Sequence, residues 1–168
     1  MSVSPARLTA FFKTRTLGSP NAAIGFVLWR LVHRFQREIN RVLAGVNLTH
    51  LQFTVLALVA WTNRTGQPVS QAELSRAGDI EPMQVSQILT VLERKGYVVR
   101  RPGQSHPRAK SAEITPAGLD TLRKAMTLAV DVQGRLFGKQ GAPGSPLLDM
   151  LLALEAASLP RPVSGVIP

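Results

Sequence analysis

The sequence predicts a mainly α-helical fold with a small β-wing: a winged helix-turn-helix lobe plus N- and C-terminal helices that form a dimerisation region. Three neighbouring elements predict it, namely a short capped helix starting at Ser70, a second helix over about Pro82–Lys95, and a basic hairpin that ends at Thr115. This order of elements is typical of a lobe that places one helix in the major groove of DNA and a hairpin over the neighbouring backbone.

The N-terminal residues 1–18 show no clear hydrophobic period, so we interpret them as a flexible arm. The first helix is expected to start at Ser19, because serine is a good N-cap and Pro20 suits the first helical position. It is expected to end near Gly45. Its apolar side chains recur at steps of three and four, which indicates one sustained apolar stripe: Ile24, Leu28, Leu31, Phe35, Ile39 and Val42.

Four arginines recur at the same steps on another face of this first helix: Arg30, Arg34, Arg37 and Arg41. We interpret this row as a solvated helix face, since the polar side of an amphipathic helix usually faces water. Contact with the DNA backbone is the alternative interpretation.

Two capping boxes mark the next two helices. In the first, Thr49 and Gln52 have the Thr-x-x-Gln spacing, which predicts a helix from Thr49 to about Trp61. In the second, Ser70 and Glu73 start a short helix that is expected to end at the following glycine, Gly78. This short helix is expected to bury three side chains: Ala72, Leu74 and Ala77.

The second helix of the lobe starts at Pro82, a residue that suits a first helical position. It turns an apolar stripe inward: Val85, Ile88, Leu89 and Leu92. Residues 97–101 and 112–115 then predict the two strands of a hairpin, joined by a flexible basic tip.

Thr115 and Pro116 repeat the cap-and-proline start, and a long helix is expected from there. A breaker-rich linker over residues 138–146 separates it from a short leucine-rich helix. The first and last helices carry more apolar surface than a monomer of this size can cover, which indicates pairing with a second copy. The expected organisation is an arm, a domain and a tail: 1–18, 19–157 (DNA-binding lobe 69–118, dimerisation helices 19–44 and 116–157) and 158–168.

The charge of the chain favours a polyanionic partner. Its 168 residues include 20 Lys and Arg against 10 Asp and Glu, a formal net charge of +10. The placement of these charges points to nucleic acid, because the segment from the end of the second lobe helix into the hairpin holds basic residues and no acidic one: Arg94, Lys95, Arg100, Arg101, Arg108 and Lys110.

The composition excludes several classes of site. The chain has no cysteine, which excludes a disulfide framework, a Cys-based zinc site and a thiol redox sensor. The three histidines, His33, His50 and His106, fall in different predicted elements with no carboxylate at ligand spacing, so no metal is expected. There is no glycine-rich phosphate loop and no Gly-x-Ser-x-Gly motif, so we expect neither a cofactor nor an enzyme.

A cytoplasmic protein without a membrane partner is expected. No segment approaches the ~20 apolar residues that are needed to span a bilayer. The N-terminus lacks an apolar run followed by a small-residue cleavage site, so it is not interpreted as a signal peptide. The absence of cysteine fits a reducing compartment.

Six segments together resemble the MarR family of bacterial winged-helix regulators: Leu48–Phe53, Val69–Leu74, Glu81–Leu89, Leu92–Val98, His106–Lys110 and Thr115–Leu119. The resemblance covers roughly residues 19–157 and implies a homodimer whose first and last helices interleave. Such a dimer presents two lobes to successive major-groove faces of a pseudo-palindromic site. The resemblance also implies a transcriptional role, most often repression that a small aromatic or phenolic ligand relieves. The family usually has Asp where His106 stands, so the carboxylate that commonly steadies the wing arginine is missing.

The expected DNA-reading surface is the outer face of the second lobe helix. Gln84 and Gln87 lie three residues apart and project to one side, and an amide can form a paired hydrogen bond with adenine. Ser86 can donate to a phosphate or a base, while Thr90 and Arg94 extend the same side toward the DNA backbone. The alternative interpretation is an ordinary solvated helix face.

Further DNA contacts are expected at the start of the short helix and in the hairpin. Free backbone N–H groups at Ser70 and Gln71 can meet a phosphate, although capping alone would explain Ser70. Arg108 is expected to enter the narrow minor groove. His106 would gain charge below about pH 6.5, which would strengthen DNA binding. The remaining basic residues are expected to neutralise phosphates: Arg100, Arg101 and Lys110.

Four side chains lie on helices that would line a cleft between the dimer end and the lobe: Trp29, His33, Phe53 and Trp61. A small aromatic ligand is one interpretation of this set, and core packing is the favoured alternative. For the whole chain, the leading hypothesis is a dimeric, sequence-specific repressor that binds double-stranded DNA. The alternatives are a winged-helix module that binds protein and an architectural protein that coats DNA without sequence preference.

Overall fold

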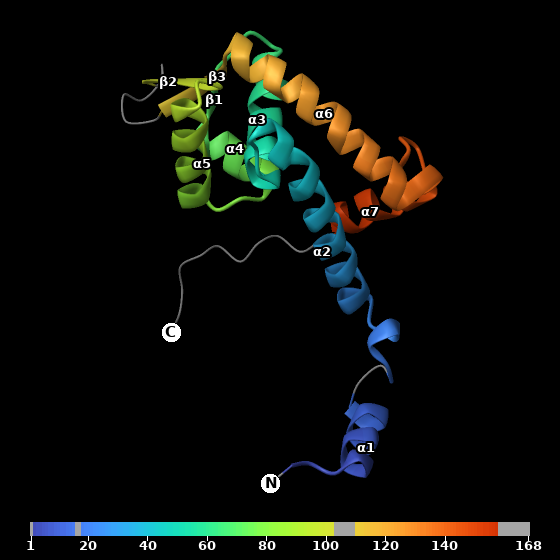
Figure 1. The fold of residues 1–168 in the computed structure, drawn as a ribbon. Helices are drawn as coiled ribbons and strands as arrows, with labels where there is room; N and C mark the ends of the chain where they lie inside the picture. Colours follow the sequence, from blue (N-terminus) through green and yellow to red (C-terminus); the bar gives the residue numbers. More distant parts are fainter. Residues whose placement is uncertain (1, 16–17, 103–109, 158–168) are drawn as a thin grey trace. The chain divides into compact units, whose positions relative to one another are not determined.

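The computed structural model describes residues 2–15, 18–102 and 110–157, and these fall into two compact units that divide between residues 129 and 130 (Figure 1). The first unit holds α1 (Pro5–Arg15), α2 (Ile24–Leu43), α3 (His50–Asn63), α4 (Gln71–Gly78), α5 (Pro82–Arg94) and three strands, β1 (Val69–Ser70), β2 (Val98–Pro102) and β3 (Lys110–Ile114). Helix α6 (Pro116–Phe137) leads into the second unit, which holds the 3₁₀ turn η3 (Gly138–Gly141) and α7 (Pro146–Ala157). The predicted fold class, mainly helical with a small β-wing, is therefore confirmed.

The three strands form one antiparallel sheet in the order β1-β3-β2. Strands β2 and β3 are the predicted hairpin, with Val98 opposite Ile114 and Arg100 opposite Ala112. The sequence did not predict β1, because two residues are too short to show an alternating pattern. The same extended backbone at Ser70 also serves as the N-cap of α4, so strand and cap share one residue.

The core of the first unit lies where α2, α3, α4 and α5 meet the sheet. The stripe predicted on α5 is buried in full. The most enclosed large apolar side chains of this core are Ile39, Leu43, Val55, Leu56, Val59, Val69, Leu74, Val85, Leu89, Leu92 and Val98. Only the C-terminal end of α2 contributes to the core, through Ile39 and Leu43. Toward the N-terminus of that helix the predicted apolar stripe is less covered: Leu31 and Phe35 are half-buried, and Ile24 and Leu28 are exposed.

Both predicted capping boxes are present. The Thr49 hydroxyl accepts a hydrogen bond from the Gln52 backbone N–H, and the Gln52 side chain accepts one from the Thr49 N–H. Ser70 and Glu73 repeat the arrangement at the start of α4. Each box satisfies two backbone N–H groups that an uncapped helix start would leave without partners.

The N-terminal segment differs from the expected flexible arm, since residues 5–15 form helix α1. Pro5 suits the first helical turn, the backbone N–H of Leu8 bonds to the Ser4 carbonyl, and no helix breaker follows before residue 15. The start of the next helix is also later than expected. Pro20–Ala22 is a separate 3₁₀ turn, and the extended backbone of Ala23 separates it from α2.

The end and the buried face of α4 differ from the prediction as well. The left-handed residue that ends the helix is Asp79, with φ of 53°, and not Gly78. A Cβ at Gly78 would lie 2.8 Å from a methyl carbon of Ile80, so that side chain would have to shift to accept a larger residue. The predicted inward residues Ala72 and Ala77 are exposed, while Leu74 and its neighbour Ser75 are buried.

No single helix among the described residues is both long and apolar enough to cross a membrane. Ile24–Val46 and His50–Asn63 meet the length and composition requirement only when taken together, across a bend of 74°.

Candidate nucleic-acid interface

Helix α5 presents the polar face that the sequence predicts for DNA reading. Its inner side is fixed in the core by four buried apolar residues, and its outer side carries exposed Gln84 and Gln87. Neither amide is hydrogen-bonded to any residue in the described parts of the chain, so both are available to a ligand. Arg94 is also exposed, one turn beyond Thr90 along the same helix.

Met83 is a surface residue of α5 that the sequence reasoning missed. It lies in the first turn of the helix and is 75% exposed, the largest exposure among the apolar residues of this helix. A thioether side chain beside two amides could contact a thymine methyl group. The sequence did offer a signal of this exposure, because Met83 lies between Pro82 and Gln84 and outside the inward apolar stripe of α5.

Arg100 lies in a different environment from the one expected of a phosphate contact. Its side chain is only 10% exposed, and its Nη1 donates to the Thr90 hydroxyl at 3.0 Å. The same guanidinium lies 4.0 Å from a carboxylate oxygen of Glu93, and its Nε is buried without a hydrogen-bond partner in the described structure. Arg100 therefore joins β2 to α5 and positions the helix.

Arg101, the next residue, faces outward and is 68% exposed. It lies 3.5 Å from the Glu113 carboxylate on the paired strand, a surface ion pair of small energetic weight. Its guanidinium is accessible to an anion, and its phosphate contact stays a prediction. The strand alternation explains why one arginine of the pair is enclosed and the other exposed.

Ser70 and Gln71 are engaged within the protein. The Ser70 hydroxyl accepts from the Glu73 N–H at 3.2 Å and donates to the Glu73 carboxylate at 2.7 Å. The Gln71 side-chain amide donates to the Pro82 carbonyl at 2.8 Å, which ties the start of α4 to the start of α5. These two side chains are thus occupied in holding the helices.

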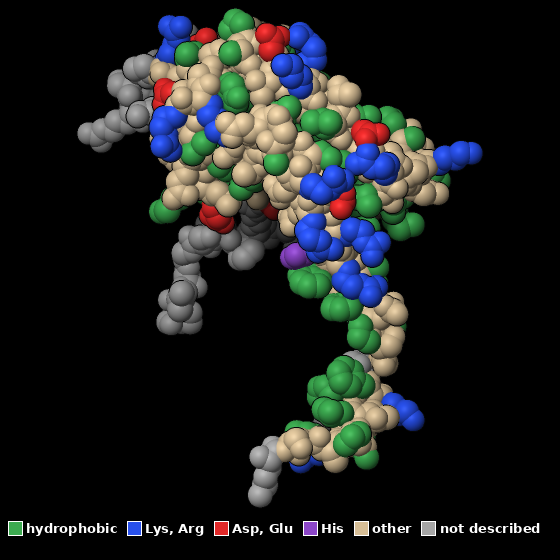
Figure 2. Space-filling view, in the orientation of Figure 1, with side chains coloured by type: hydrophobic (Ala, Val, Ile, Leu, Met, Phe, Trp, Pro, Cys, Tyr) green, Lys and Arg blue, Asp and Glu red, His purple; other side chains and the backbone are tan. Residues whose placement is uncertain are grey.

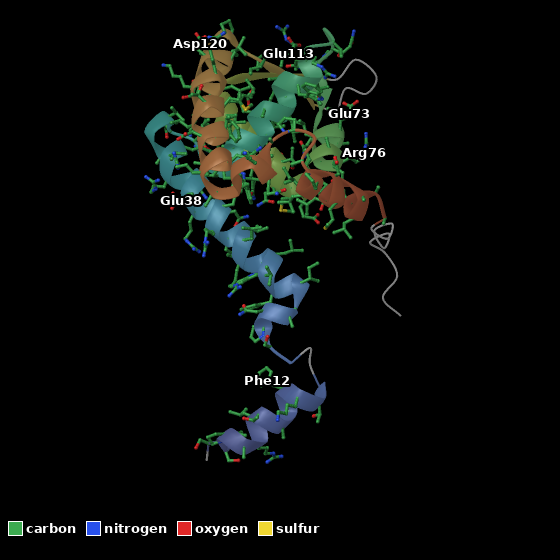
Figure 3. All side chains as sticks on the ribbon, turned by 90° about the vertical axis from the view of Figure 1, so that its right-hand side faces the viewer. Phe12, Glu38, Glu73, Arg76, Glu113 and Asp120 are labelled. Atoms are coloured by element: carbon green, nitrogen blue, oxygen red, sulfur yellow. The ribbon has the colours of Figure 1, made fainter. Side chains whose placement is uncertain are left out.

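The charge of Glu73 bears on any anion at the start of α4. Hydrogen bonds from Ser70 lower the pKa of Glu73, and the nearby Arg76 lowers it further (Figure 3). A carboxylate held ionised at this helix start already occupies the favourable end of the helix dipole. A DNA phosphate would therefore have to approach beside Glu73.

The tip of the wing lies outside the described residues. His106 and Arg108 fall in residues 103–109, and the Lys110 side chain is likewise not described, although its backbone pairs with Pro102. The expected roles of these three residues stay predictions.

Two further side chains connect the lobe, in roles that the sequence did not predict. The Lys95 ammonium donates to the Asn47 carbonyl and to the Gln52 side chain, and burial lowers the pKa of Lys95. It ties the end of α5 to the junction of α2 and α3. The Asn63 side chain accepts from the Ile114 N–H at 2.8 Å and thereby fixes the sheet on α3.

The arginine row of α2 is exposed along its whole length, and Figure 2 shows Lys and Arg side chains gathered along this helix. Arg30 donates to the Asn21 side chain at 3.0 Å, and Arg41 pairs with Glu38 at 2.8 Å. Arg34 and Arg37 have no ion pair within the described residues. The exposure of this row fits a solvated helix face and equally fits contact with the DNA backbone.

The four candidate ligand residues are not all brought together. Trp29 and His33 contact each other on α2, with ring centroids 4.3 Å apart. Phe53 and Trp61 lie on α3, eight residues or about 12 Å apart along the helix axis. Trp61 is 64% exposed and lies under the Arg64 guanidinium, 3.5 Å from its ring centroid. Core packing is therefore wrong as an explanation for Trp29 and Trp61, which both face outward.

Within the described residues, no group of three or more His, Asp or Glu side chains could hold a metal ion. His33 lies against Trp29, whereas His50 contacts the Phe35 ring edge-on at 5.4 Å. Burial lowers the pKa of His50, which favours its neutral form.

Comparison with known proteins identifies the family. A sequence model of the MarR family matches residues 45–109. An HTH-type transcriptional regulator of Bacillus cereus is 30% identical over 118 residues, which cover 68% of this chain and 76% of the relative.

Two solved structures of the regulator CouR have the same fold. The transcriptional repressor CouR bound to a 23-mer DNA duplex matches with a TM-score of 0.65 at 27% identity, over 84% of this chain and 95% of that one. CouR from Rhodococcus jostii RHA1 bound to p-coumaroyl-CoA matches with a TM-score of 0.72 at 24% identity, over 86% and 98%. This chain therefore belongs to the MarR family of winged helix-turn-helix transcriptional regulators, which are DNA-binding proteins and not enzymes.

Proposed function

We propose that this regulator is a homodimeric repressor that binds a pseudo-palindromic operator through α5 and the wing. The observation that carries the proposal is the pair of exposed, unengaged amides, Gln84 and Gln87, on a helix whose opposite face is locked in the core. CouR, which shares the fold, is a repressor bound to duplex DNA in its structure.

In this proposal Gln84 and Gln87 read base edges, since an amide can accept from adenine N6 and donate to N7. Ser86, Thr90 and Arg94 lie along the same helix and approach the DNA backbone. The other proposed contacts position the protein on the DNA backbone without reading sequence, apart from Arg108, which enters the minor groove: the α4 start at Gln71, and the wing residues Arg101, His106 and Lys110. Ser70 and Arg100 act from inside the lobe, where Ser70 caps α4 and Arg100 holds α5 in place.

Dimer formation is supported by exposed apolar surface on both terminal parts of the chain. On α2 the exposed set that serves this proposal is Ile24, Phe26, Val27, Leu28 and Val32. On α7 it is Leu148, Met150, Leu151, Leu152 and Leu154. A monomer would leave each of these two sets exposed to water, and exposed apolar surface of this kind marks an interface. A two-fold dimer would place its two α5 helices in successive major grooves, about 34 Å apart.

Selection from a random DNA pool tests the proposal. We expect the bound fragments to contain an inverted repeat with half-site centres about 10 base pairs apart. Gln84→Ala and Gln87→Ala should each cost about 1–3 kcal/mol of binding free energy and relax the preference at one position in each half-site. The control is Gln36→Ala, an exposed glutamine on α2, which should leave affinity and preference unchanged.

The alternatives give different results in the same experiment. Tight but salt-sensitive binding with no enriched sequence would indicate an architectural protein. A folded dimer that ignores duplex DNA at low ionic strength would contradict the proposal and favour a protein-interaction module.

We further propose that a small aromatic ligand regulates DNA binding by contacting Trp29 and His33. The support is the ring pair on α2, in which Trp29 is exposed, and the p-coumaroyl-CoA bound to CouR. Titration with salicylate or p-coumaroyl-CoA should quench tryptophan fluorescence saturably, and Trp29→Phe should lose this quenching while Trp61→Phe keeps it. A flat titration through millimolar ligand would contradict the proposal.

A further inference from the structure

Met83 is an apolar side chain at the centre of the face of α5 that points away from the core. Among the large apolar residues that the structure describes as exposed, it has the highest exposed fraction, 75%. It precedes Gln87 by four residues and Thr90 by seven, so the three share the helical face opposite the buried stripe. A single exposed methionine is common on protein surfaces, so its surroundings decide what it can contact.

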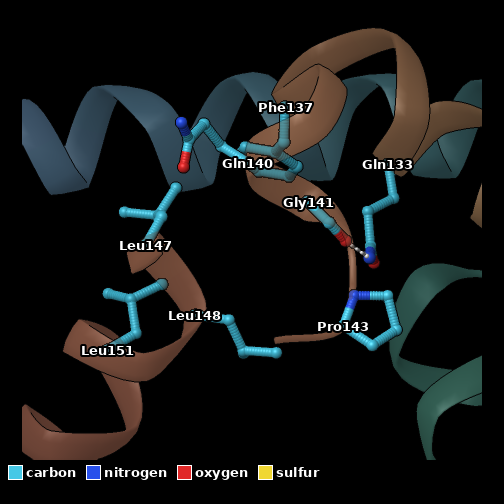
Figure 4. Close-up of a pocket in the computed structure, with 8 residues that line it drawn as sticks. All are labelled: Gln133, Phe137, Gln140, Gly141, Pro143, Leu147, Leu148 and Leu151. Carbon is cyan, nitrogen blue, oxygen red and sulfur yellow. Dashed lines mark hydrogen bonds between the residues drawn. The ribbon is translucent and has the colours of Figure 1, made fainter. Parts of the chain in front are cut away.

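The surroundings of Met83 on α5 differ from those of an apolar docking surface. In the second unit, exposed leucines gather at a cavity of about 220 Å³, whose lining includes Phe137, Leu148 and Leu151 (Figure 4). On α5 the other exposed residues are Pro82 and side chains that are polar or charged. The core of a protein interface needs a continuous apolar set, whereas one isolated methionine can cover an apolar group about as large as a methyl.

The major groove of DNA presents an apolar group of that size. Thymine carries a 5-methyl group beside its O4 acceptor, and apolar side chains contact it there. In helix-turn-helix lobes the N-terminal residues of the second helix reach the base edges, and Met83 lies in the first turn of α5. The unbranched thioether side chain of methionine adapts readily to the shape of its partner.

The backbone that carries Met83 is held in place on both sides. Before it, the Pro82 carbonyl accepts a hydrogen bond from the Gln71 side chain at 2.8 Å, which ties this turn to α4. After it, Val85 is completely buried, and its N–H donates to the Glu81 carbonyl at 3.0 Å. A side chain on such a fixed turn can be placed against one base with little loss of order.

The hydrogen bonds of the next outward residue limit base reading to the start of α5. The Thr90 hydroxyl donates to the Ser86 carbonyl at 2.9 Å and accepts from Arg100 at 3.0 Å, so it is engaged on both sides. Gln87 lies one turn from Met83, about 6 Å along the helix axis. Because base pairs are stacked about 3.4 Å apart, groups contacted by these two side chains would lie within two base pairs of each other.

We propose that Met83 contacts the 5-methyl group of one thymine in each operator half-site and makes recognition depend on that methyl group. The inference rests on the proposed function, because it requires α5 in the major groove. It adds a second kind of readout to that function. The glutamines read hydrogen-bonding groups of the bases, and Met83 reads an apolar group that uracil and unmethylated cytosine lack.

Replacement of thymine by uracil in the selected operator tests the contact, because deoxyuridine pairs as thymidine does and lacks only the methyl group. Each thymine is replaced in turn, at equivalent positions of both half-sites, and the affinity of the full-length protein is measured by fluorescence anisotropy. At one position, within two base pairs of the adenine assigned to Gln87, Kd should rise about fourfold per half-site and about fifteenfold for both. Uracil in the flanks of the same duplex is the control and should leave Kd unchanged.

Two variants complete a double-mutant cycle with this uracil. Met83→Ala should bind the thymine operator more weakly and should no longer distinguish it from the uracil operator. Met83→Leu keeps an apolar side chain and should retain most of the discrimination. Since Met83 is exposed, urea denaturation should show both variants to be as stable as the unmodified protein. Undiminished discrimination by folded Met83→Ala overturns the inference.

The same measurements separate this inference from the function on which it rests. An inverted repeat whose preference is relaxed by Gln87→Ala, together with a uracil scan that has no sensitive position, overturns the methyl contact and leaves the proposed function standing. A selected half-site with no thymine within two base pairs of that adenine does the same. A protein that selects no sequence overturns both.

Discussion

Replacing Gly118 with alanine is expected to lower the free energy of unfolding by about 3 kcal/mol or more and to abolish DNA binding with it. A Cβ at this position would lie 2.1 Å from the Tyr97 carbonyl oxygen and 2.9 Å from its carbonyl carbon. That oxygen also accepts the Thr115 N–H at 3.0 Å, in the contact that seats the start of α6 on the wing. Because the obstacle is backbone, α6 or β2 must move.

Chemical denaturation with urea measures the effect, and Gly134→Ala on the same helix is the matched control. Nothing lies within 4 Å of a Cβ added at Gly134, and its backbone is helical. There the same substitution should raise the free energy of unfolding by up to about 1 kcal/mol, because alanine has the higher helix propensity. Equal stability of the two variants would show that the close approach at Gly118 is not maintained in solution.

The parts of the fold that the sequence predicted are those determined over short distances along the chain. Both capping boxes join residues three apart, and the apolar stripe of α5 repeats within 13 residues. The contacts that it could not predict join distant residues. Lys95 and Asn47 are 48 positions apart, and Asn63 and Ile114 are 51 apart, so no local pattern announces either pair.

The same distinction runs through the candidate DNA-binding site. Exposure of Gln84 and Gln87 followed from the helical period alone, and it is confirmed. The capping box predicted that Ser70 is hydrogen-bonded to Glu73. The hydrogen bond from the Gln71 side chain to the Pro82 carbonyl could not be predicted, because it depends on how α4 and α5 pack. Basic residues of one cluster therefore cannot be assigned equal roles by composition, because packing decides which of them reach an anion.

Arg100 and Arg101 provide the sharpest test of that conclusion. Arg100→Ala should lower the free energy of unfolding by about 2 kcal/mol, since it removes a charged hydrogen bond to Thr90 inside the lobe. It should also weaken operator binding, because α5 loses its brace to β2. The salt dependence of binding should stay as in the unmodified protein, since no phosphate contact is removed.

Arg101→Ala should do the reverse. Its guanidinium is exposed, so the free energy of unfolding should change by less than about 0.5 kcal/mol. If Arg101 neutralises one phosphate per lobe, the slope of log K against log salt should fall by about 0.9 per lobe. Fluorescence anisotropy at several salt concentrations, beside urea denaturation of each variant, measures both quantities. A fully stable Arg100→Ala variant with the reduced salt slope would contradict the internal brace between β2 and α5. It would show instead that Arg100 neutralises a DNA phosphate, the role that its place in the basic cluster predicts.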